Sequence, residues 1–175
     1  MKILLSGVFL TLLLSFSAAA QQKNLGTGDA APEFSVTAID GTKLTLSQMK
    51  GKVVLVAFWA TYCPICHAEI PRLNAIAESC KGKDIVFLGV TSEKEPVVTQ
   101  HLKKEPFGFT IVPDGFGLMM QYGDKKNGQM DMGFPNYYLI DQKGMVAFRG
   151  SGYDKTAELE TKIAALLAPA KPGGR

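Results

Sequence analysis

Two cysteines separated by two residues follow a buried-strand pattern, and this arrangement constrains the fold more than any other feature of the chain. Residues 53–59 are mostly apolar and rich in β-branched side chains, whereas the segment after Cys63 has the apolar spacing of an amphipathic helix. Cys63 and Cys66 therefore lie where a strand becomes a helix. Pro64 suits the first helical position, because its ring fixes φ and its missing N–H would have no partner there.

This position gives the two cysteines different expected roles. The free N–H groups and the positive dipole at a helix N-terminus favour a thiolate over a thiol, so Cys63 is expected to attack disulfides. Cys66, one turn deeper, would close the ring and release the partner. The competing interpretation is a structural disulfide or two core thiols. A disulfide that closes so short a loop stabilises a fold very little, but it can be opened and re-formed by thiol exchange. The spacing therefore favours redox chemistry.

The first 20 residues have the pattern of a secretory signal. Lys2 supplies a positive start, residues 3–16 are largely apolar, and three alanines at 18–20 form a small-residue cleavage site. A retained membrane anchor is the alternative, because the apolar stretch approaches the length of a membrane span. We expect a cleaved signal at 1–20, a flexible leader at 21–30, one domain at 31–168 and a tail at 169–175. A periplasmic location follows from this prediction.

Charge and cysteine content exclude several classes of protein. The net charge is only +3 and the lysines are scattered, which argues against a nucleic-acid groove. Three cysteines are too few for a disulfide scaffold. One pair at this spacing instead indicates redox chemistry, or attachment of a metal or haem.

Strand and helix patterns alternate along the rest of the chain. Helices are expected at 63–79, with a kink at Pro71, and at 93–105, opened by Thr91 or Ser92. Two more helices are expected at 116–122 and 156–167, and residues 123–133 are expected to form a polar loop. Strands are expected at 33–39, 43–46, 53–59, 84–90, 109–112, 136–140 and 145–148. The strand–helix–strand order from 53 to 90 implies a right-handed parallel crossover.

Five motifs together resemble the TlpA/ResA-like periplasmic thiol-disulfide oxidoreductases of the thioredoxin superfamily. They lie at 28–34, 51–56, 58–66, 69–71 and 138–141. The resemblance covers about residues 28–167. It implies an α/β fold with a thioredoxin-like central mixed sheet flanked by helices, an N-terminal β-hairpin and a central αβ insertion at about 84–117. The motif at 28–34 is less specific, because peroxiredoxins share it.

The resemblance also implies a substrate-binding surface. Pro135 corresponds to the cis-proline that this superfamily places beside its cysteine pair, where the backbone edge can pair with a substrate chain. Phe134 departs from the small or β-branched residue that is usual before that proline. Trp59 is expected to form a packing wall beside the site and Tyr62 to contact the partner. With Pro64, these residues make up the expected substrate-binding set.

Glu69 is the third expected catalytic residue. Thioredoxins carry a buried acid two residues before the tryptophan, where this chain has Ala57, whereas ResA-like proteins carry a glutamate three residues after the second cysteine. The resemblance therefore implies that Glu69 is a partly buried base for the Cys66 proton. The alternative is a solvated charge on the helix surface, which is the commonest environment of glutamate.

These observations favour an exported, monomeric thiol-disulfide oxidoreductase that acts as a reductase. No cofactor or metal is expected, because the electrons reside on sulfur. Expected partners are protein thiols and disulfides, with apocytochrome c and other exported proteins as candidates, and a membrane electron donor; no nucleic acid is expected.

Three other functions remain open at this point. The motif at 28–34 would also suit a thiol peroxidase. Residues 63–67 spell the C-x-x-C-H of haem attachment, although His67 is more often a solvent-facing helix residue. Four methionines could suggest copper binding, but methionine is more often core filler; they are Met119, Met120, Met130 and Met132. Cys80 is expected to be an inert buried thiol.

Overall fold

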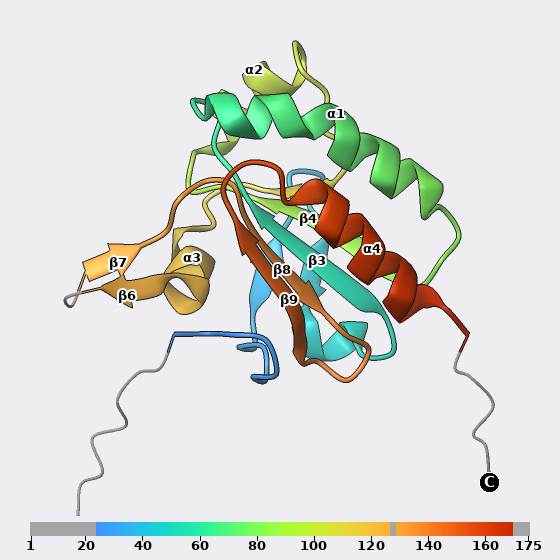
Figure 1. The fold of residues 1–175 in the computed structure, drawn as a ribbon. Helices are drawn as coiled ribbons and strands as arrows, with labels where there is room; N and C mark the ends of the chain where they lie inside the picture. Colours follow the sequence, from blue (N-terminus) through green and yellow to red (C-terminus); the bar gives the residue numbers. More distant parts are fainter. Residues whose placement is uncertain (1–23, 127–128, 170–175) are drawn as a thin grey trace, which may run out of the picture.

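A five-stranded mixed sheet forms the centre of the computed structural model, which describes residues 24–126 and 129–169 (Figure 1). Its strand order is β5-β4-β3-β8-β9. The strands are β3 (Val53–Phe58), β4 (Ile85–Val90), β5 (Thr110–Val112), β8 (Asn136–Ile140) and β9 (Val146–Ser151). β3, β4 and β5 run parallel, whereas β8 pairs antiparallel with β3 and β9 antiparallel with β8. The predicted signal segment lies outside the described residues.

Side chains alternate along β3 between two apolar cores, one on each face of the sheet. Leu55 and Ala57 belong to the core that also contains residues of α1 (Pro64–Ser79), α2 (Glu95–Leu102) and α4 (Thr156–Leu167). Val54 and Val56 belong to the opposite core, with α3 (Phe116–Tyr122) and the 3₁₀ helix η1 (Leu46–Met49). Every residue of β3 is buried, which explains its continuous apolar sequence. Figure 1 shows α1 and α4 together on one face.

The segment before the first hairpin docks against the edge of the sheet. Gly28 N–H donates to Val146 O at 2.8 Å, and Ala31 N–H donates to Gly144 O at 2.9 Å. The predicted hairpin follows as β1 (Ser35–Thr37) and β2 (Lys43–Thr45). The motif at 28–34 thus has a structural role at the start of β9.

Most of the predicted elements are present, and α3, β8 and α4 have the predicted bounds. Other bounds differ, because β1 is shorter than expected, α2 ends at Leu102 and β9 continues to Ser151. Two further predictions are wrong. α2 begins after Lys94 and is not opened by Thr91 or Ser92, because the Thr91 hydroxyl instead bonds Glu93. The predicted loop at 123–133 contains a hairpin of β6 (Asp124–Lys126) and β7 (Gln129–Asp131). In the described part of the chain, no helix is long and apolar enough to cross a membrane.

Candidate active site

The first turn of α1 is built around the Cys63 sulfur. Cys63 is the residue that caps α1, and its Sγ accepts a hydrogen bond from Cys66 N–H at 3.1 Å. Pro64 occupies the first helical position, where it needs no backbone partner. The predicted strand-to-helix junction is therefore confirmed. An N–H group of the helix already points at this sulfur, as stabilisation of a thiolate requires.

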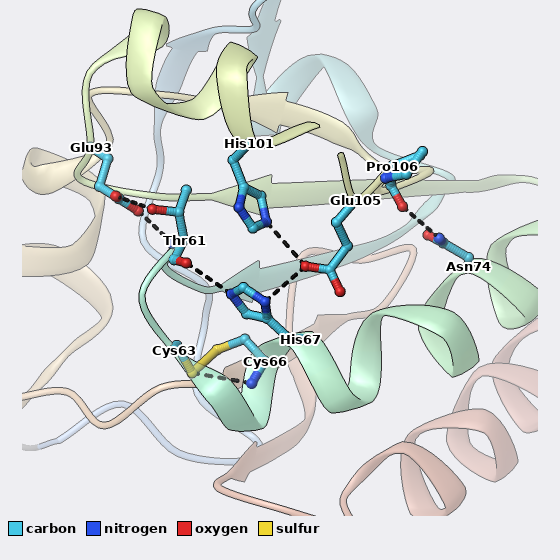
Figure 2. A network of polar contacts seen from close by, with 9 residues as sticks. All are labelled: Thr61, Cys63, Cys66, His67, Asn74, Glu93, His101, Glu105 and Pro106. Carbon is cyan, nitrogen blue, oxygen red and sulfur yellow. Dashed lines mark hydrogen bonds and ion pairs between the residues drawn. A yellow bond between two sulfur atoms is a disulfide. The ribbon is translucent and has the colours of Figure 1, made fainter. Parts of the chain in front are cut away.

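Cys63 and Cys66 form a disulfide, which Figure 2 shows, and the two residues differ in exposure. Cys63 is 7% exposed and Cys66 2%. Cys63 is thus the more accessible of the two, although both are buried. The residues around it, Tyr62, Pro64 and Ile65, are exposed, and they form a rim above the disulfide. The Cys63 side is therefore the more accessible side for a partner.

Cys66 borders a small apolar cavity. The cavity has a volume of about 10 Å³, about that of one water-sized probe. Trp59 and Pro135 both line it, and the Phe134–Pro135 peptide bond is cis. Pro135 therefore lies beside the cysteine pair, as the resemblance implied. The complete lining is Ala57, Phe58, Trp59, Cys66, Ile70, Leu73, Phe107, Pro135 and Tyr137.

The expected substrate-binding residues divide into a surface set and a buried set. Tyr62 and Pro64 are exposed, and Phe134 is half-buried. Trp59 is 2% exposed and packs edge-on against Phe107, so it is a wall of the site and offers almost no surface to a partner.

Glu69 is buried, so the alternative of a solvated helix charge is wrong. Its side chain is bonded from two other elements: the Tyr137 hydroxyl donates to Oε2, and Asp154 N–H donates to Oε1 at 2.7 Å. Tyr137 pairs with Ala57 across β3 and β8. Burial, and then the bond to Glu69, raise the pKa of Tyr137, which therefore remains the donor.

A polar network on the other side of the helix start was not anticipated from the sequence. Figure 2 shows His67 between the Thr61 carbonyl and Glu105, with His101 nearby. The prediction of a solvent-facing His67 is therefore wrong, because both ring nitrogens lie against oxygen atoms. Glu93 holds the same loop by accepting Thr61 N–H at 2.6 Å. These contacts join α1 to residues about 30 positions away, and no local spacing signals them.

The remaining candidates lie away from this site. Cys80 is buried and forms no disulfide among the described residues, consistent with the prediction of an inert thiol. Met119 belongs to the core between the sheet and α3, and Met132 packs against that core. Both act as apolar filler.

Comparison with known proteins identifies the family of the chain. The Redoxin family matches residues 26–167. The chain belongs to the Redoxin family. This Redoxin protein is 31% identical to the thiol-disulfide oxidoreductase ResA of Bacillus cereus (strain ZK / E33L) over 160 residues, which cover 90% of this chain and 87% of ResA. It is also 31% identical to the thiol:disulfide interchange protein DsbE of Vibrio cholerae over 183 residues, which cover 97% and 92% of the two chains.

Solved structures agree with this assignment. A candidate thiol:disulfide interchange protein DsbE from Chlorobium tepidum aligns with a TM-score of 0.72 and 30% identity, covering 83% of this chain and all (100%) of the other. The predicted thioredoxin-like fold and the ResA-like resemblance are confirmed. With the Cys63–Cys66 pair, these similarities establish this Redoxin protein as a thiol-disulfide oxidoreductase.

Proposed function

We propose that this protein is an exported reductase that opens disulfides in other exported proteins. The observation that carries the proposal is the Cys63–Cys66 disulfide at the N-terminus of α1, with the Cys63 side facing the exposed rim. The predicted signal at 1–20 supports export to the periplasm. Glu69 supports the exchange chemistry, because a carboxylate one turn after Cys66 can take up the Cys66 proton and return it. The reductive direction is part of the proposal, and the reduction potential tests it.

The proposed reaction transfers two electrons in two exchange steps. In the reduced enzyme, the Cys63 thiolate attacks a partner disulfide. That bond breaks, a bond between Cys63 and the partner forms, and the partner's other sulfur leaves as a thiolate that takes up a proton. Cys66 gives its proton to Glu69 and attacks Cys63, which restores the Cys63–Cys66 disulfide and releases the second partner thiol. The enzyme's dithiol is oxidised and the partner is reduced; a membrane electron donor then regenerates the dithiol.

The partner would bind on the surface around Cys63. Tyr62 and Pro64 offer exposed contact area, and the chain at Phe134–Pro135 lies beside Cys66, where an extended substrate segment could pair. Apocytochrome c and other exported proteins with cysteine pairs are the substrates we propose.

The reduction potential of the Cys63–Cys66 pair tests the direction of electron flow. The reduction potential of thioredoxin, a reductant, is about −270 mV, whereas that of the oxidant DsbA is about −120 mV. We expect a value close to that of thioredoxin, measured by equilibration with glutathione or dithiothreitol. A value close to that of DsbA would overturn the reductase assignment but not the exchange chemistry.

Trapping tests the roles of the two cysteines. Cys66→Ser should accumulate a mixed disulfide through Cys63 with exported proteins, whereas Cys63→Ser should not. Iodoacetamide should modify Cys63 of the reduced protein before Cys66 or Cys80, as read by mass spectrometry. Rapid hydrogen peroxide consumption without any trapped partner would favour the thiol peroxidase alternative instead.

A further inference from the structure

Both histidines of the chain meet in one cluster next to the active-site helix. His67 lies on α1 and His101 on α2, and their ring centroids are 4.9 Å apart. Glu105, which follows α2, places Oε2 at 2.8 Å from His67 Nδ1 and at 3.2 Å from His101 Nε2. One ligand atom from each residue lies within 4.8 Å of the other two. Figure 2 shows the three side chains pointing toward one another.

The contacts of His67 leave one of its ring nitrogens facing a carboxylate. His67 Nε2 lies 2.8 Å from the Thr61 carbonyl oxygen, which can only accept, so Nε2 carries the hydrogen. In a neutral ring, Nδ1 then presents its lone pair to the Glu105 carboxylate. Two acceptors at 2.8 Å repel each other unless a second proton or a metal ion lies between them. A histidine whose other nitrogen donates to a backbone carbonyl is also the usual arrangement of a metal ligand.

His101 has a buried nitrogen in need of a partner. Among the described residues, its Nε2 has no hydrogen-bond partner, and its approach to Glu105 lacks hydrogen-bond geometry. The ring packs against Trp59, with 5.6 Å between ring centroids, and against His67. Packing therefore fixes this nitrogen toward Glu105, and a buried polar atom held in this way costs free energy until it finds a partner.

We propose that His67, His101 and Glu105 bind one divalent transition-metal ion, with Zn²⁺ as the best match. Two imidazoles and a carboxylate form a ligand set that zinc uses when its fourth position is open. Zinc bonds of about 2.0–2.1 Å in a tetrahedron separate ligand atoms by about 3.3 Å, so small side-chain shifts would suffice. His67 and Glu105 are about one-third exposed, which leaves room for a water molecule at the fourth position. The expectation of a metal-free protein is revised accordingly.

The site uses no sulfur, and this separates it from metal binding by the redox cysteines. The test therefore uses the full-length oxidised protein, without a polyhistidine tag, in which Cys63 and Cys66 are paired. Titration calorimetry with Zn²⁺ should give one ion per chain. His67→Gln, His101→Gln and Glu105→Gln should each weaken binding by about 100-fold or more, because loss of an outer-shell partner alone costs about 10–100-fold.

A carboxylate variant elsewhere on α1 provides the matched control. Glu78 lies on the exposed side of the helix and pairs with Lys81. Glu78→Gln should therefore bind Zn²⁺ like the wild type. Zn²⁺ should also raise the melting temperature of the wild type and of Glu78→Gln, but not that of Glu105→Gln.

Two results would overturn the proposal. In the first, the wild type binds Zn²⁺ no more tightly than a His67→Gln/His101→Gln double variant does. The cluster would then be held together without a metal ion. The second is a Co²⁺ complex with intense thiolate charge-transfer bands, which would place the metal at Cys80 rather than at nitrogen and oxygen ligands. If His101→Gln fails to fold, the variants at the two partly exposed positions, His67 and Glu105, decide the matter.

Discussion

At the scale of single residues, a buried carboxylate is unfavourable unless its oxygens are paired. Glu69 meets this requirement with one donor from Tyr137 and one from Asp154 N–H. A carboxylate offers about four acceptor positions, so capacity remains for the Cys66 proton. The same contacts tie α1 to β8 and to the segment before α4. Glu69 therefore combines a structural role with the proposed catalytic role, and experiments must separate the two.

Glu69→Gln should slow the resolution of the mixed disulfide by about 100-fold, because it removes the base and keeps the size of the side chain. Formation of the mixed disulfide through Cys63 should be nearly unchanged. Stopped-flow kinetics with a model disulfide, read separately for the two steps, measures this effect. Equal loss in both steps would indicate a folding defect and count against the proposed base.

Tyr137→Phe is the control that keeps the base. It removes the hydroxyl that donates to Glu69 but leaves the carboxylate and the Asp154 bond in place. We expect a loss of about 1–3 kcal/mol in the free energy of unfolding, with resolution much faster than in Glu69→Gln. Urea titration and the same kinetic experiment test both statements. Resolution as slow as in Glu69→Gln would assign the effect to packing.

At the scale of elements, the loop between β3 and α1 is held by the connection between β4 and α2. Glu93 accepts hydrogen bonds from Thr61 N–H at 2.6 Å, from the Thr61 hydroxyl at 2.5 Å and from the Thr91 hydroxyl at 3.1 Å. Thr61 lies two residues before Cys63. The position of the redox pair therefore depends on the parallel crossover as well as on the helix.

Glu93→Ala should lower the free energy of unfolding by about 1–3 kcal/mol, because the half-buried Thr61 groups lose their acceptor. Amide hydrogen exchange at Thr61 should become faster. The control is Glu95→Ala, which changes an exposed glutamate in the first turn of α2. If both variants have the same stability and the same exchange at Thr61, the proposed anchor is incorrect.

A second tie between elements explains the hairpin of β6 and β7. The Arg149 guanidinium binds both carboxylate oxygens of Asp124, donates to Leu25 O at 3.0 Å and lies over the Tyr138 ring. This arginine thus connects β9 to the hairpin and to the N-terminal segment. The planar guanidinium binds the carboxylate in a bidentate manner, through two N–H groups at once. The single ammonium group of lysine cannot do this.

Arg149→Lys should therefore destabilise the protein, and a double-mutant cycle with Asp124→Asn should give a coupling free energy of about 1 kcal/mol or more. Urea unfolding of the four proteins measures it. A coupling near zero would mean that the hairpin is held by other contacts.

At the scale of the whole molecule, three buried tyrosines link the N-terminal segment, the sheet and the helices. The Tyr122 hydroxyl donates to Pro32 O at 2.8 Å, the Tyr138 hydroxyl donates to Tyr122 O, and the Tyr137 hydroxyl donates to Glu69. Burial is the main cause that raises the pKa of all three, and it raises that of Tyr138 to about 12.

Stability should therefore fall at alkaline pH. A tyrosine in the unfolded chain ionises at about pH 10, and the pKa of the three folded tyrosines is higher. Their contribution to the free energy of unfolding is therefore complete below about pH 10. It is lost as the pH rises from 10 toward 12. Urea unfolding across this range, with tyrosinate absorbance at 295 nm, measures it. Tyr138→Phe should flatten the fall, whereas Tyr153→Phe, at an exposed position, should not; a wild-type-like slope in Tyr138→Phe would contradict the assignment.

Local sequence determined much of this protein. The apolar run of β3, Pro64 after Cys63, and the helical spacing that follows predict the strand, the helix and the position of the redox pair, because each depends on near neighbours. The resemblance added two expectations: that Pro135 is the cis-proline beside the cysteine pair, and that Glu69 is a partly buried base. The bounds of α3, β8 and α4 followed from the same local patterns.

The tertiary structure alone decided which distant groups meet. Glu69 receives its donors from positions 68 and 85 residues away, and the hairpin of β6 and β7 depends on Arg149. His67 and His101 come together only because the crossover brings α2 beside the start of α1. Periodicity reports which face of an element is buried, but it carries no information on which polar side chains that face will meet. The physical reason is that hydrogen bonds and ion pairs form between atoms close in space, whatever their separation along the chain.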